Sequence, residues 1–178
     1  DSVTHVSCFN GSNGTGQLYI SGGVSPYIYS WPNSNPNALP AGFNVYEVLD
    51  ANNCLYIDSV FIDQPLPISV NESVNNVLCY GDNNGSISAI ASGGTPLSTG
   101  SYNYLWSPNN QSSYNISNLI AGTYNLVVTD SVDCFIDTTF VLTEPPQIIL
   151  NTESEDLLCY GDSSAFINLF VEGGSPGY

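Results

Sequence analysis

The chain has 178 residues, with 16 acidic side chains, one His and neither Lys nor Arg, so its formal charge is −16 at pH 7. Apolar residues make up 42% of the sequence and aromatic residues 12%, which is enough to fill folded cores. A surface of one charge sign repels phosphate backbones and anionic lipids, which excludes nucleic acid and polybasic membrane docking. The composition fits selection for solubility and equally selection for resistance to trypsin-like proteases.

No stretch of the sequence reaches the roughly 18 consecutive apolar residues of a membrane helix, so we expect no direct membrane insertion. The start of the chain also lacks the charged and apolar regions of a secretion signal. We therefore expect any signal or sorting segment to lie outside this sequence.

An internal repeat starts three times, at Cys8, Cys79 and Cys159. Cys-Tyr-Gly-Asp opens the last two copies and Cys-Phe-Asn-Gly opens the first, and a Gly-Gly pair and a Pro follow each start. The first two copies continue with a Trp, an Ala-Gly pair, and an Asp four residues before a second cysteine, which is Cys54 or Cys134. The copies differ in length between the Gly-Gly and Ala-Gly pairs, which indicates a loop there.

Proline-marked junctions separate the copies at Gln64–Pro67 and at Glu144–Pro146, because such segments are short, stiff and extended. They predict three repeats. These are an N-terminally truncated repeat over 1–65, a complete repeat over 66–145 and a C-terminally truncated repeat over 146–178.

Short β-rich segments alternate with turn residues in the complete repeat, and no apolar period of helix length is present. The expected strands cover residues 68–78, 86–92, 102–107, 113–118, 123–130 and 135–143. Six or seven strands in about 75 to 80 residues are typical of an immunoglobulin-like fold. The sequence therefore predicts an all-β protein of tandem immunoglobulin-like β-sandwich repeats arranged end to end.

Period-two alternation gives two of these strands a buried stripe. The stripes are Tyr102, Tyr104 and Trp106 on one strand, and Tyr124, Leu126 and Val128 on the other. The segment before Tyr124 is typical of a tyrosine corner, in which the hydroxyl reaches back to upstream backbone. Repeat one departs from this pattern, because Asn44 stands where the corner tyrosine should be, and the sequence leaves open whether a corner bond forms there.

Six landmarks recur in a fixed order: Cys-Tyr-Gly-Asp-Asn-Asn-Gly-Ser-Ile, Ser-Gly-Gly-Thr-Pro, Tyr-x-Trp, Leu-x-Ala-Gly-Thr-Tyr, Val-Thr-Asp-x-x-x-Cys and Glu-Pro. This order resembles the SprB-type repeat of giant cell-surface adhesins in gliding Bacteroidota, and the resemblance covers essentially the whole chain. It implies export by type IX secretion, display as a cell-surface filament, and a role in surface adhesion during gliding motility.

Five cysteines in an exported protein indicate disulfides. Counting strands places both cysteine-bearing turns of a repeat at the same end of the sandwich. We therefore predict bonds from Cys8 to Cys54 and from Cys79 to Cys134, with a partner for Cys159 outside the chain. Each bond would contribute ~4 kcal/mol in the chain-entropy model. Zinc is disfavoured because no two cysteines lie two to four residues apart.

Oxygen ligands gather at two turns of the complete repeat, where Asp82 and Asn84 stand in one and Asp130 and Asp133 in the other. If these turns share an end, Ca²⁺ could neutralise the local charge. A plain Asn-Gly turn explains the first group equally well. Apart from this calcium candidate, no cofactor is expected.

The resemblance also implies O-glycans, because Asp-Ser or Asp-Thr before an apolar residue or Thr looks like the acceptor pattern of secreted proteins in this bacterial group. The candidate acceptors are Ser2, Ser59, Ser131 and Thr138. Ser59 and Thr138 fall on the last strand of successive repeats, where outward side chains could carry a sugar.

Catalysis is not expected, because the only histidine, His5, has no counterpart in the other copies. The leading function is a non-catalytic stalk or adhesive segment of a filament at the extracellular cell surface, in contact with neighbouring repeats and an external surface or polysaccharide. One alternative is a passive spacer in a secreted enzyme or capsule protein. Another is a carbohydrate-binding module that uses exposed aromatic residues such as Tyr27, Tyr29, Tyr102 or Tyr104.

Overall fold

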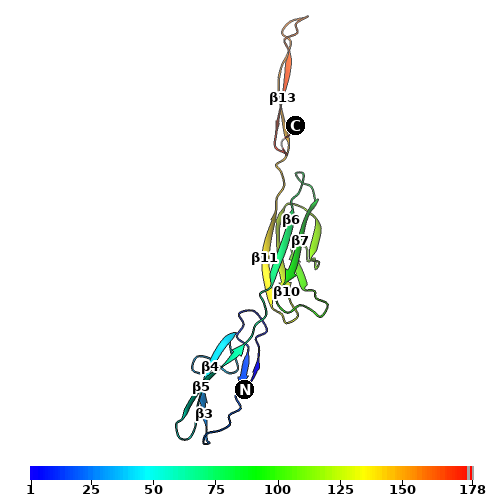
Figure 1. Cartoon of the computed structure of the whole chain (residues 1–178). Coiled ribbons are helices and arrows are strands. Elements are labelled where there is room, and N and C mark those ends of the chain that lie inside the picture. Colours follow the sequence, from blue (N-terminus) through cyan, green and yellow to red (C-terminus); the bar gives the residue numbers. More distant parts are fainter. Residues whose placement is uncertain (176, 178) are drawn as a thin grey trace. The chain divides into compact units, whose positions relative to one another are not determined.

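The computed structural model describes residues 1–175 and 177, and β-strands form all of their regular secondary structure (Figure 1). The predicted all-β class is therefore confirmed, with several small antiparallel sheets consistent with β-sandwiches. Pro176, which belongs to the third Gly-Gly-Pro landmark, lies outside the described residues.

The chain forms two compact units, and they do not follow the predicted repeats residue by residue. One unit contains Asp1–Asn71, Ala91–Tyr104 and Val127–Asp137, and the other contains Glu72–Ile90, Leu105–Leu126 and Thr138–Tyr178. The repeat boundaries at residues 65 and 145 stay a prediction.

Five strands form repeat one, and they belong to two sheets. The strands are β1 (Ser2–Thr4), β2 (Thr15–Gln17), β3 (Ile28–Ser30), β4 (Gly42–Leu49) and β5 (Leu55–Ile62). β1 pairs with β2, and the second sheet has the order β3-β4-β5, with antiparallel neighbours throughout.

The core of repeat one comes from residues that alternate along these strands and from the segments between them. Its buried side chains are Val6, Leu39, Tyr46, Val48, Val60 and Ile62. Trp31 is partly buried and packs on Tyr46, with 5.4 Å between the ring centroids. Full burial of one large apolar side chain is worth about 1.5–3 kcal/mol, so this cluster holds the two sheets together.

Six strands form repeat two, one at each of the expected segments. They are β6 (Ser69–Asn75), β7 (Gly85–Ser92), β8 (Asn103–Ser107), β9 (Asn115–Leu119), β10 (Gly122–Thr129) and β11 (Phe135–Leu142). The sheets have the orders β6-β7-β9 and β11-β10-β8. Every strand overlaps its predicted segment.

The predicted buried stripe is present on β10, whereas of the other predicted stripe only Trp106 is buried and Tyr102 and Tyr104 are half-buried. Tyr124, Leu126 and Val128 are all nearly or completely buried along β10. Trp106 on β8 is fully buried, and its indole N–H donates a hydrogen bond of 2.8 Å to the Ser113 carbonyl. The indole therefore has a polar partner inside the core, as a buried Trp requires.

The third copy contributes one antiparallel hairpin, formed by β12 (Ile149–Glu155) and β13 (Phe166–Glu172). In sequence these strands correspond to β6 and β7 of repeat two. Apolar side chains such as Ile167 and Leu169 are exposed, because no further strand of the described chain packs on the hairpin.

The tyrosine corner is confirmed in repeat two and has a substitute in repeat one. The Tyr124 hydroxyl donates a hydrogen bond of 3.0 Å to the Ile120 carbonyl. Asn44 occupies the matching place, and its side-chain amide donates to the carbonyl of Pro40 at 2.9 Å. Pro40 is the counterpart of Ile120, so a shorter side chain makes the same connection. The question that the sequence left open is therefore answered, because the side-chain amide of Asn44, which is 4% exposed, reaches this carbonyl.

The corner bond should contribute measurably to stability. Replacing Tyr124 by Phe removes the donor to Ile120 and leaves a carbonyl without its partner, which should lower the free energy of unfolding by about 1 kcal/mol. Chemical denaturation followed by tryptophan fluorescence measures this change. Tyr114→Phe is the matched control, because this half-exposed hydroxyl has no hydrogen-bond partner in the described chain. Equal effects of the two substitutions would contradict the assignment.

Candidate functional site at the paired cysteines

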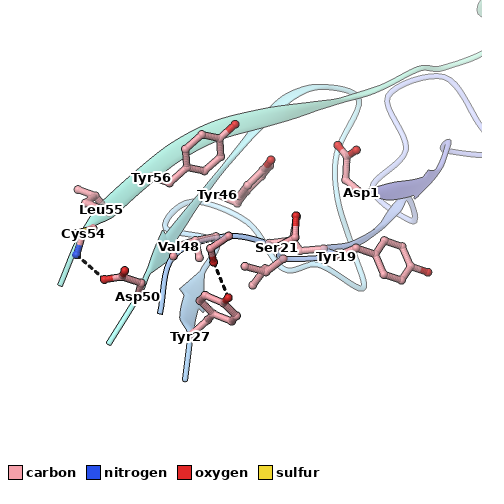
Figure 2. A pocket seen from close by; sticks show the side chains of 14 residues that line it. Asp1, Tyr19, Ser21, Tyr27, Tyr46, Val48, Asp50, Cys54, Leu55 and Tyr56 are labelled. Carbon is pink, nitrogen blue, oxygen red and sulfur yellow. Dashed lines mark hydrogen bonds between the residues drawn. The ribbon is translucent and has the colours of Figure 1, made fainter. Parts of the chain in front are cut away.

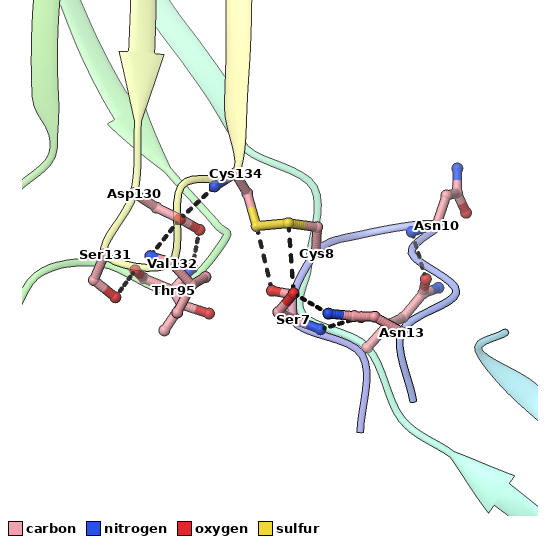
Figure 3. The surroundings of a disulfide bond; sticks show 10 residues. Ser7, Cys8, Asn10, Asn13, Thr95, Asp130, Ser131, Val132 and Cys134 are labelled. Carbon is pink, nitrogen blue, oxygen red and sulfur yellow. Dashed lines mark hydrogen bonds between the residues drawn. A yellow bond between two sulfur atoms is a disulfide. The ribbon is translucent and has the colours of Figure 1, made fainter. Parts of the chain in front are cut away.

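One disulfide is present in the described chain, and it joins Cys8 to Cys134 with 5.6 Å between the Cα atoms (Figure 3). It links the first cysteine of repeat one to the second cysteine of repeat two, and both residues belong to the first compact unit. Cys54, Cys79 and Cys159 are free and exposed. The structure therefore contradicts the predicted bonds from Cys8 to Cys54 and from Cys79 to Cys134.

The two cysteine-bearing turns of repeat one lie at opposite ends. We call the end where the first strand of a repeat begins its leading end, and the end where its last strand stops its trailing end. Cys8 lies at the trailing end, where Val6 N–H donates to the Asp63 carbonyl at 3.2 Å. Cys54 follows the far end of β4, where Leu49 pairs with Leu55. An eight-residue strand is roughly 26 Å long, so these cysteines cannot meet.

The strand count behind the prediction failed in one segment. Residues 28–39 cross repeat one once but in two pieces that belong to different sheets. Ile28–Ser30 pairs with β4, whereas Leu39 bridges to Gly14 beside β2. Treating the two pieces as two full strands adds one reversal of the chain, which moves the second cysteine to the wrong end.

A buried carboxylate fixes the turn that carries Cys134. Asp130 is 1% exposed and accepts backbone N–H bonds from Thr95 at 2.8 Å, Val132 at 3.0 Å and Cys134 at 3.0 Å. The Ser131 hydroxyl donates to the Thr95 carbonyl at 2.8 Å. Because a carboxylate satisfies several amides at once, the loop is held in one conformation and the thiol is presented toward Cys8 (Figure 3).

Repeat one has the same loop in a more open setting. Asp50 accepts N–H bonds from Val24 at 3.1 Å, Asn52 at 2.9 Å and Cys54 at 2.9 Å. These bonds, led by that from the Cys54 amide, hold the pKa of Asp50 below its usual range. A lowered folded-state pKa means that this contribution to stability is present above the unfolded pKa and is lost as pH falls through the folded one.

A cleft adjoins this loop and opens between the strands of repeat one (Figure 2). It has a volume of about 520 Å³. Its lining includes Tyr19, Tyr27, Tyr46 and Tyr56, together with Asp50, Cys54, Gly22 and Gly23. The cleft therefore combines aromatic walls, one carboxylate and a free thiol.

The predicted calcium ligands do not come together. Asp82 and Asn84 bond to each other at 2.8 Å in a turn whose Gly81 amide donates to Glu144, a residue that follows β11. Asp133 precedes β11, and Asp130 is occupied by backbone amides. In residues 1–175 and 177, no group of three or more His, Cys, Asp or Glu is placed to hold a metal ion.

The glycan candidates occupy different surroundings. Ser2 is exposed on β1, and Ser59 is half-buried on β5. The Ser131 hydroxyl is engaged in the hydrogen bond to Thr95. Thr138 is half-buried and shares the face of the buried residue Phe140, so it does not project outward as predicted. Glycosylation itself stays a prediction.

The remaining candidates have structural partners. His5 accepts a hydrogen bond of 3.0 Å from the Asp63 amide through its Nδ1 atom. The hydroxyls of Tyr27 and Tyr102 donate to backbone carbonyls, and that of Tyr104 accepts from the Ala91 amide. Tyr29 remains as an exposed ring, so most of the aromatic residues considered for carbohydrate binding belong to the framework.

These features define a class of protein, namely an all-β repeat region whose polar side chains and cysteines serve the framework. The model of the SprB repeat family matches residues 1–36 and 71–111. These two segments are similar to SprB repeats, so the predicted resemblance is confirmed for them. This is a structural, non-catalytic repeat family that occurs in cell-surface, adhesin-like proteins.

No curated protein matches the chain. Within the described residues, no helix is long and apolar enough to cross a membrane.

The cysteine pairing can be read by peptide mapping. Alkylation of the folded, unreduced chain should modify the three free thiols, and a protease that cuts after acidic residues should release Cys8 joined to Cys134. Recovery of a peptide in which Cys8 is joined to Cys54 would show that the pairing described here is wrong.

Asp130 should be far more important for stability than its neighbour. Asp130→Asn replaces one acceptor oxygen by an NH₂ group that cannot accept from a backbone N–H. This should lower the free energy of unfolding by about 1–3 kcal/mol. Asp133→Asn makes the same charge change at an exposed position with a φ of 63°, which Asn tolerates, so its effect should be near zero. Urea midpoints of the two variants compare them directly. A midpoint for Asp130→Asn that equals that of Asp133→Asn would refute the role of the buried carboxylate.

Proposed function

We propose that the chain is a non-catalytic stalk and adhesive segment of a secreted cell-surface filament that mediates surface adhesion in gliding motility. The observation that carries this proposal is the Cys8–Cys134 bond, because it connects two repeats covalently at a second point besides the chain itself. A filament under tension must resist separation of its repeats. A bond between cysteines 126 residues apart in sequence prevents the chain between them from being extended.

The outer face of repeat one supports an adhesive role. Phe43 on β4 and Phe61 on β5 are register partners, and their rings lie 5.0 Å apart. They are 77% and 51% exposed, beside the partly exposed Val45. Exposed apolar patches of this kind mark contact surfaces. Val141, the counterpart of Phe61 in repeat two, is exposed without an aromatic neighbour, so the aromatic pair belongs to repeat one.

The export route and the filament are supported by the family. SprB repeats occur in cell-surface proteins, which agrees with a surface location. The excess of negative charge opposes aggregation between molecules. A passive spacer has the same framework but needs no adhesive surface. An experiment that measures adhesion therefore distinguishes the two functions.

Adhesion can be tested with beads that carry the purified chain. Under flow across glass or a polysaccharide-coated surface, wild-type beads should resist detachment. The double variant Phe43→Ser, Phe61→Ser should detach at lower flow, because the apolar contact is lost. Val141→Ser is the matched control and should behave as wild type.

The host cell provides the second measurement. Deleting the coding segment of this chain should reduce attachment and gliding. If wild-type beads detach as readily as uncoated ones and the deletion leaves attachment unchanged, the chain is a passive spacer and the proposal fails.

A further inference from the structure

The segment between the first two repeats occupies a defined seat at the leading end of repeat two. The Gly94 amide donates a hydrogen bond of 2.8 Å to the Leu66 carbonyl. The Pro67 carbonyl oxygen lies against Gly93, where an added Cβ would be only 2.0 Å away. Ile68 is buried and lies against Gly94, whose added Cβ would be 2.7 Å from both the Ile68 side chain and the Asp130 carboxylate. The Gly-Gly pair thus accepts the incoming strand.

The same seat recurs in the third copy. The Gly174 amide donates to the Pro146 carbonyl at 2.7 Å, and a Cβ on Gly173 would be 1.9 Å from the Gln147 carbonyl oxygen. Both glycines have positive φ, as their counterparts in repeat two do. The incoming segment is therefore a regular part of the repeat.

In repeat one the same seat is formed, and the residues that correspond to Leu66, Pro67 and Ile68 would precede Asp1. Gly22 and Gly23 have φ values of 82° and 63°, close to the 83° and 56° of their counterparts Gly93 and Gly94. No atom lies within 4 Å of a Cβ added to Gly22. Asp50 is half-buried, whereas Asp130 under Ile68 is 1% exposed. The cleft of Figure 2 is the space that the strand fills in the other copies.

Cys54 lines this open seat, and it is the counterpart of the bonded Cys134. The Cys54 and Cys134 amides donate to the matching aspartates at 2.9 Å and 3.0 Å. The two turns therefore present their thiols in the same way, although only Cys134 has a partner among the described residues.

The trailing end of repeat two is the other half of the same arrangement. Val77 N–H donates to the Thr143 carbonyl at 3.0 Å, as Val6 N–H does to Asp63 at 3.2 Å. The hollow beside Cys79 is lined by Leu78, Cys79, Tyr80, Pro145, Pro146, Gln147, Ile148, Gly174 and Ser175. The hollow beside Cys8 has matching walls, and in addition a turn that contains Cys134. Among the described residues, the surroundings of Cys79 therefore match those of Cys8 except for the cysteine-bearing turn.

We propose that one two-part joint recurs along this protein. The extended segment that leaves a repeat fills the Gly-Gly seat of the next, and the first cysteine of a repeat forms a disulfide with the second cysteine of the next. The open cleft of repeat one is then a strand-acceptor site for the exit segment of a preceding repeat, whose first cysteine bonds to Cys54. Cys79 bonds to the second cysteine of the repeat that contains Cys159. The joint is independent of whether the surface of the filament is adhesive.

Each bond forms when two thiols lose two protons and two electrons and their sulfur atoms join. The acceptor is another disulfide, that of oxidised glutathione or of a thiol–disulfide oxidoreductase, which is reduced to two thiols. Cys54 and Cys79 are exposed, so both can reach such an oxidant.

The test adds a preceding repeat to the full chain. A copy of residues 66–151 is placed directly before Asp1, so that Asp1 follows Asn151 where Thr152 does naturally. After oxidation with oxidised glutathione, peptide mapping should find Cys54 joined to Cys79 of the copy. Alkylation of Cys54, complete in the unextended chain, should fall close to zero. A Cys79→Ser change in the copy is the matched control and should leave Cys54 reactive.

Two results would overturn the proposal. One is a folded extended chain in which Cys54 stays reactive, and the other is a bond from Cys54 to Cys8. Folding is checked by the presence of the Cys8–Cys134 bond in the same map.

The strand seat has its own measurement on the unextended chain. A synthetic peptide of residues 64–71 should bind the cleft and slow hydrogen exchange of the Gly23 amide, the counterpart of the Gly94 amide that is bonded to Leu66. The same peptide with Ile68→Asp should not protect this amide, because its carboxylate would face Asp50. Equal protection by both peptides, or protection by neither, contradicts a strand-acceptor site.

Discussion

The carboxylates of this protein have no Lys or Arg to pair with, and the carboxylates that shape its turns are bound by backbone amides instead. Asp50 and Asp130 each accept three N–H groups, two of them from the turn that ends in a cysteine. Hydrogen bonds to a carboxylate are stronger than those between neutral groups, and an amide acceptor cannot replace both oxygens. The position of each second cysteine thus depends on one aspartate, and the rest of the leading end is arranged around it.

The arrangement has a consequence for the connection between repeats. In repeat one, the cysteine-bearing turns lie at opposite ends, so a bond between Cys8 and Cys54 is impossible. The Cys8–Cys134 bond and the segment Pro65–Ile68 then make two connections at the same place. Two connections oppose bending and extension more strongly than a linker alone, which suits a repeat region of a cell-surface protein.

The glycine pair also bears on which kind of ligand the tyrosine-lined cleft binds. Aromatic walls and a carboxylate are common in carbohydrate sites, and the cleft could be taken for one. The glycine pair at its edge points to another occupant, because the corresponding glycines in the other two copies lie against the carbonyls of an incoming strand. Tyr27 supports this interpretation, since its hydroxyl is already bonded to the Gly22 carbonyl.

Local patterns in the sequence determined the β class, the six strands of repeat two, the buried stripe on β10 and the corner bond of Tyr124, because each depends on residues close together in the chain. The substitute bond of Asn44 could have been predicted by the same argument, since Pro40 lies four residues before it.

The cysteine pairing could not be predicted from local patterns, because it depends on how many times the chain crosses the repeat. Residues 28–39 have the composition of two short strands and make one crossing shared between two sheets. Both sheets bury the same kinds of side chains, so only the tertiary structure decides which sheet each piece joins. The sheet that each piece joins sets the direction of the later strands, and this places Cys8 beside Cys134.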